Sequence, residues 1–81
     1  MTRKELDRVV RKQVMESTWK LQEKMRKQGA NPVDFYSVLM FTLVSMAAFA
    51  GKMQGLPRSG FEDMARVATD EGYEDCNGRR L

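Results

Sequence analysis

Hydrophobic residues recur at helical spacing along the first third of the chain. No proline or glycine interrupts residues 2–28. Residues four or seven positions apart lie on one face of an α-helix. The residues with this spacing are Leu6, Val10, Val14, Leu21 and Met25. The pattern predicts one long amphipathic helix over residues 2–28.

The middle of the chain is apolar without any helical sidedness. Residues 35–51 include no charged side chain, and large apolar residues occur at almost every register position. Asn31 and Pro32 precede this run, and they are favoured residues at the N-cap and at the first position of a helix. The sequence therefore predicts a second helix over residues 32–52, apolar on every side.

Turn-forming residues separate this run from a third, weaker helical pattern. Ser59 and Glu62 have the spacing of a capping box, and Gly72 is a favoured residue type just beyond a helix C-terminus. The apolar stripe between them is Phe61, Met64, Ala65 and Ala68. We predict a third helix over residues 60–71, a single helical domain over residues 1–73 and a flexible tail over residues 74–81. The expected fold class is all-α.

The apolar central helix requires more cover than this chain provides. A domain of this size buries only a little over ~60% of its unfolded surface, and two amphipathic neighbours each contribute one apolar stripe. Association with a second copy covers the remainder, and closed homodimers are the commonest oligomers. We therefore predict a homodimer or higher oligomer. Its expected interface residues are Phe35, Leu39, Phe41, Val44, Met46 and Phe49.

A membrane-spanning helix is the alternative interpretation of residues 35–51. Seventeen uncharged residues reach the lower end of the roughly 17–25 needed to cross a bilayer. Polar side chains at Ser37, Thr42 and Ser45 interrupt the run, however, and charged residues border it on both sides. We favour a core helix of a cytoplasmic oligomer, since the N-terminus shows no signal-peptide pattern.

Charge is distributed unevenly along the chain. The net charge is only +3, but residues 1–28 hold nine basic and four acidic side chains. Residues 61–75 hold six acidic side chains and one arginine. A basic segment and an acidic segment of one chain could lie against each other across an oligomer interface.

Candidate catalytic chemistry is sparse in this sequence. The chain has no histidine, and its lone Cys76 excludes an internal disulfide. No glycine-rich phosphate loop or nucleophile motif occurs. We therefore expect a protein that is not an enzyme and that uses no metal or cofactor.

The first predicted helix has a basic side next to its apolar stripe. Its candidate binding residues are Arg8, Arg11, Lys12, Met15, Trp19 and Arg26. Met15 and Trp19 are four residues apart and could simply cover a neighbouring helix, with the basic side chains around them. The same residue types are enriched at protein-binding hot spots. They could also contact nucleic acid, with Trp19 stacking on a base.

These observations together favour a binding protein over an enzyme. We predict a small protein-binding protein that acts as a homodimer on another protein. Small helical chains without motifs are frequent in bacteriophages and mobile elements, so a viral inhibitor or adaptor of a host protein is one form of this hypothesis. Nucleic-acid binding through the first helix and a single membrane span through residues 35–51 are the alternatives.

Overall fold

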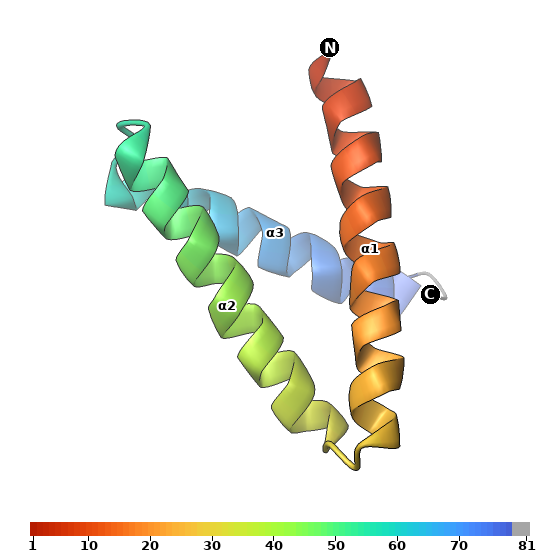
Figure 1. The fold of residues 1–81 in the computed structure, drawn as a ribbon. Helices are drawn as coiled ribbons and strands as arrows, with labels where there is room; N and C mark the ends of the chain where they lie inside the picture. The colour runs from red at the N-terminus through yellow and green to blue at the C-terminus, as the bar shows by residue number, and fades with distance from the viewer. Residues whose placement is uncertain (79–81) are drawn as a thin grey trace. The chain divides into compact units, whose positions relative to one another are not determined.

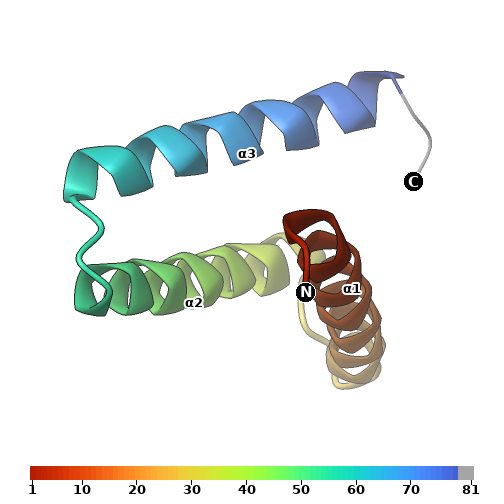
Figure 2. The ribbon, with the colours of Figure 1, turned by 90° about the horizontal axis from the view of Figure 1, so that it is seen from above.

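Three α-helices make up the protein in the computed structural model, which describes residues 1–78, with side chains to residue 74. They are α1 (Arg3–Lys27), α2 (Pro32–Met53) and α3 (Arg58–Gly78) (Figure 1; Figure 2). No strand occurs within residues 1–78. The predicted all-α class and the number of helices are confirmed.

The boundaries of α1 follow from its capping residues. Thr2 precedes the helix, and its Oγ1 accepts a hydrogen bond from the Glu5 N–H at 3.1 Å. At the other end Gly29 has a φ of 86°, the left-handed conformation that glycine adopts without steric strain. The Ala30 N–H then donates to the Met25 carbonyl at 3.0 Å. This is a Schellman motif, and it ends α1 where the sequence predicted.

An N-cap residue and a C-terminal glycine also set the limits of α2. The Asn31 Oδ1 accepts from the Val33 N–H at 2.8 Å, as expected of an N-cap. At the C-terminus Gly55 has a φ of 86°, and the Leu56 N–H donates to the Gly51 carbonyl at 2.9 Å. A second Schellman motif therefore ends α2 within one residue of the predicted limit.

The third helix is longer at both ends than the sequence predicted. It begins at Arg58, so Ser59 lies in its first turn and is not the N-cap of a capping box. Glu62 instead accepts a hydrogen bond from Arg58 Nε at 2.8 Å. The predicted stop at Gly72 is wrong, because that glycine has no positive φ. A helix-interior glycine costs only about 1 kcal/mol, and no proline follows it to stop the helix.

Part of the expected tail is thus helical. Residues 74–78 belong to α3. Residues 79–81 lie outside the described part of the chain.

The chain divides into two compact units, Met1–Met40 and Phe41–Leu81, with the division inside α2. In the first unit the Tyr36 hydroxyl donates to Gln22 Oε1, which joins the start of α2 to α1. The half-buried residues of this unit are Thr18, Gln22, Met25, Phe35 and Leu39. Those of the second unit are Ala48, Gly51, Leu56, Gly60, Phe61 and Ala65. No residue between 1 and 74 is fully buried.

Two glycine substitutions are expected to act in opposite directions. A Cβ at Gly72 would meet nothing within 4 Å, so Gly72→Ala should stabilise the protein by about 0.5–1 kcal/mol through helix propensity. Gly29→Ala also meets nothing within 4 Å. Its positive φ should nevertheless make that substitution destabilising by about 1–2 kcal/mol. Urea titration followed by circular dichroism gives both values, and two changes of the same sign would contradict the argument.

Candidate binding surfaces

The most apolar helix of the protein is exposed. Phe41 and Phe49 on α2 are 66% and 70% accessible to solvent. Val44 and Met46 are exposed as well, whereas Phe35 and Leu39 are half-buried in the first unit. The Phe35 ring lies edge-on to Tyr36, with the ring centroids 5.0 Å apart. Four of the six residues expected at an oligomer interface are therefore exposed in the single chain.

Length and composition also make α2 compatible with a lipid environment. The helix has 22 residues and a mean hydropathy of 1.7 over its most apolar window, sufficient by these criteria to cross a membrane. At 1.5 Å per residue it is about 33 Å long, close to the thickness of a bilayer core.

The basic side of α1 presents an aromatic residue to solvent. Trp19 is 60% exposed and Met15, one turn earlier, is 47% exposed. Most of the Trp19 surface is therefore accessible in the single chain, whereas slightly more than half of the Met15 surface is covered. We define the α1 surface as the six residues expected from sequence, which all lie on this helix: Arg8, Arg11, Lys12, Met15, Trp19 and Arg26.

Two arginines of the α1 surface form ion pairs with acidic residues of the same helix. Arg11 Nε lies 2.9 Å from Asp7 Oδ1, and Arg26 makes two hydrogen bonds to Glu23, of 3.1 and 2.5 Å. The α1 surface itself includes no acidic residue. Long arginine side chains, however, reach carboxylates three or four residues away along a helix. This pairing lowers the positive charge that the surface offers to an acidic partner of any kind, protein or nucleic acid.

The Glu23–Arg26 pair affects the protonation of both groups. The hydrogen bond from Arg26, helped by its charge, lowers the pKa of the Glu23 carboxyl below its usual value of 4.5. The hydrogen bond to Glu23 and its negative charge raise the pKa of Arg26. More than half of each side chain is exposed to solvent, so the pair is a local helix contact and not a buried ionic site.

A pH titration should detect this pair. Because the folded pKa of Glu23 is lowered, its stabilising effect is fully present above the unfolded pKa and is lost as the pH falls through the folded pKa. Helicity near the C-terminus of α1 is expected to decrease slightly between about pH 5 and pH 3. NMR titration of the Glu23 side chain would measure its pKa. Arg26→Gln should return that pKa to the usual value, and an unchanged pKa in this variant would contradict the assignment.

The acidic residues of α3 form a contrasting surface. Asp63 is paired with Arg66 at 2.9 Å. Asp70 and Glu74, one helical turn apart, are both exposed and form no ion pair with another residue of the described chain. Exposed Val67 and Tyr73 lie on either side of them in the helical register. We call Val67, Asp70, Tyr73 and Glu74 the α3 surface.

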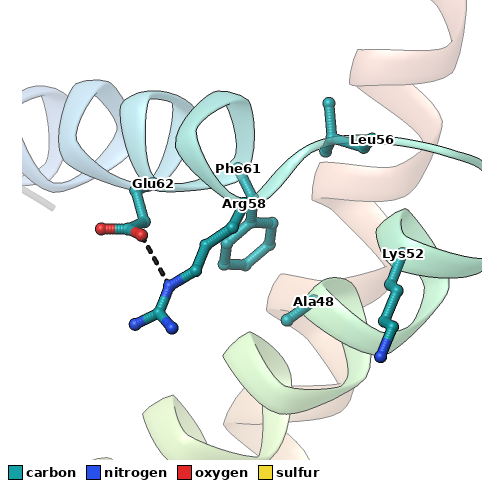
Figure 3. A pocket seen from close by; sticks show the side chains of 6 residues that line it. All are labelled: Ala48, Lys52, Leu56, Arg58, Phe61 and Glu62. Atoms are coloured by element: carbon teal, nitrogen blue, oxygen red, sulfur yellow. Dashed lines mark hydrogen bonds and ion pairs between the residues drawn. The ribbon is translucent and has the colours of Figure 1, made fainter.

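A groove lies at the corner between α2 and α3 within the second unit (Figure 3). Its volume is about 550 Å³. The residues that line it are Ala48, Lys52, Leu56, Arg58, Phe61 and Glu62. The aromatic ring of Phe61 points into it, while Arg58 and Glu62 join each other at its rim (Figure 3). Nothing in the sequence pattern indicated this groove, because it depends on how α2 and α3 meet.

Leu56 holds this corner together. A Cβ built on Gly51 or on Gly60 would lie 3.2 Å from a terminal methyl group of Leu56. The leucine side chain therefore occupies space that larger residues at these positions would fill. Two glycines nine residues apart on either side of a leucine are the only signal in the sequence for this contact.

Comparisons of the chain with protein-family models, with curated proteins and with solved structures find no match. Within the described residues, no group of three or more acidic or cysteine side chains is placed to hold a metal ion. The features of the described chain that could bind a partner are exposed α2, the α1 surface and the α3 surface.

Proposed function

We propose that this protein is a small non-catalytic binding protein that works as a homo-oligomer and contacts another protein through the α1 surface. The exposure of α2 carries the proposal. Phe41 and Phe49 expose about two thirds of their area in a single chain. Burying a phenylalanine side chain contributes about 1.5–3 kcal/mol.

A second copy is well suited to cover this helix. In a two-fold dimer each α2 residue is buried twice, once in each subunit, so a modest contact per chain becomes a large total. Large apolar patches on soluble proteins also tend to mark interaction sites. Self-association thus removes the most unfavourable surface of the protein without any further component.

The chemistry of the α1 surface favours an acidic protein as the external partner. Tryptophan and arginine are the residue types most enriched at binding hot spots, and Trp19 is exposed among basic side chains. Arg8 and Lys12 form no ion pair with other described residues. Opposite charges on a partner would steer its approach. An inhibitor or adaptor of a host protein would have this kind of surface.

Sedimentation equilibrium tests the proposal directly. The wild-type chain is expected to sediment as a dimer or larger species at about 10 μM without detergent, given the apolar area available for burial. A 9.3 kDa monomer at every accessible concentration would refute self-association.

Insertion of α2 into a membrane is the second candidate, and the length and hydropathy of this helix favour it specifically. The basic α1 would then lie on the side of the membrane that retains positive charge. Flotation with lipid vesicles separates the two candidates. A dimer stays in solution without detergent, whereas a spanning protein is recovered only with vesicles or in detergent.

A further inference from the structure

Two pairs of charged residues on different helices match each other in spacing. Arg8 and Lys12 lie one turn apart on α1, and Asp70 and Glu74 lie one turn apart on α3. All four side chains are exposed, and none forms an ion pair with another described residue. Two cations and two anions with the same four-residue spacing can meet across a pair of packed helices.

Apolar residues accompany both charge pairs. Met15 and Trp19 continue the α1 surface beyond Lys12, and both are exposed. Val67 and Tyr73 flank the acidic pair on α3 and are exposed as well. Contact between the two surfaces would therefore bury apolar area together with the ion pairs, which is how interfaces gain both affinity and register.

We infer that the α1 surface of one copy docks on the α3 surface of a second copy. The inference rests on the proposed self-association and names the occupant of the α1 surface within the assembly. A two-fold dimer forms this contact twice, with α1 of each copy on α3 of the other. An external acidic partner then binds by displacing α3, so that self-association and partner binding compete.

Charge-reversal variants test the contact. Variant X carries Arg8→Glu and Lys12→Glu, and variant Y carries Asp70→Lys and Glu74→Lys. Each variant alone places like charges opposite each other in both contacts of the dimer. Each is therefore expected to self-associate about tenfold more weakly than wild type, or weaker still. An equimolar mixture of X and Y restores opposite charges in both contacts, and its affinity should return to within about threefold of wild type.

A matched control carries Lys20→Glu and Lys24→Glu. This pair has the same spacing and the same charge change as variant X, but lies on another side of α1. Its self-association should equal that of wild type. Circular dichroism of all variants confirms that the helices are intact, and sedimentation velocity measures the species in each sample.

The possible outcomes separate the inference from the proposed function. Recovery of the dimer only in the X–Y mixture supports the inference. If wild type self-associates but the mixture does not recover, the contact is wrong and the proposed oligomer still stands. The same charges could instead form ion pairs within one chain. In that case X and Y each lose helicity as monomers, and mixing them does not restore it. This outcome also overturns the inference. A wild type that never self-associates refutes the proposed function itself.

Discussion

Replacement of Phe41 and Phe49 by serine is expected to convert the proposed oligomer into a monomer. Each ring is about two thirds exposed in the single chain, so about 1–2 kcal/mol of burial per ring is available to an interface. Loss of four rings from a dimer removes about 4 kcal/mol or more of association free energy. The dissociation constant is then expected to rise ~1000-fold. Sedimentation equilibrium over a wide range of concentration measures this change.

Met53→Ser is the matched control for this pair. Met53 is exposed like the two phenylalanines and ends α2, but it lies outside the uncharged run of residues 35–51. Its substitution should leave the association constant nearly unchanged. Equal weakening by Met53→Ser and by the phenylalanine pair would indicate nonspecific hydrophobic association and not a defined α2 interface.

Leu56→Ala is expected to loosen the corner between α2 and α3. Truncation of a fully buried leucine costs about 2–5 kcal/mol, and Leu56 is half-buried, so a loss of about 1–2 kcal/mol is expected. The two Leu56 methyl groups that lie beside Gly51 and Gly60 are removed in this variant. Hydrogen exchange should therefore accelerate across the end of α2 and the start of α3.

Two further substitutions give this experiment its controls. Leu56→Met keeps nearly the same volume and should cost less than Leu56→Ala. Leu39→Ala, at a half-buried position of the first unit, should accelerate exchange in that unit instead. Uniform acceleration throughout the chain after Leu56→Ala would show that the corner is not a local contact.

Local signals predicted α1 and α2 well because they act through the backbone of neighbouring residues. Asn31 and Gly29 set the ends of these helices by hydrogen bonds and by a positive φ, within a few residues of their own positions. The third helix lacked such a stop. Gly72 is compatible with a helix interior, so its presence alone predicted an end that the backbone does not have.

The candidate surfaces were only partly visible in the sequence. Periodicity placed Met15 and Trp19 on one side of α1, and both are exposed. Their electrostatic surroundings were missed, because side-chain rotamers bring Asp7 and Glu23 to two of the arginines. The groove beside Phe61 was missed as well, since it forms where two helices meet and no periodic pattern within one helix encodes it.

By itself the sequence determined the helices and the excess of apolar residues at the centre of the chain. Periodicity and capping depend on residues close together in the sequence, so they can be read without knowledge of long-range contacts. Only the tertiary structure decided which apolar residues stay exposed, that Leu56 packs against Gly51 and Gly60, and which charges are paired. Burial and ion pairing depend on residues brought together in space, so they follow from packing and not from order along the chain.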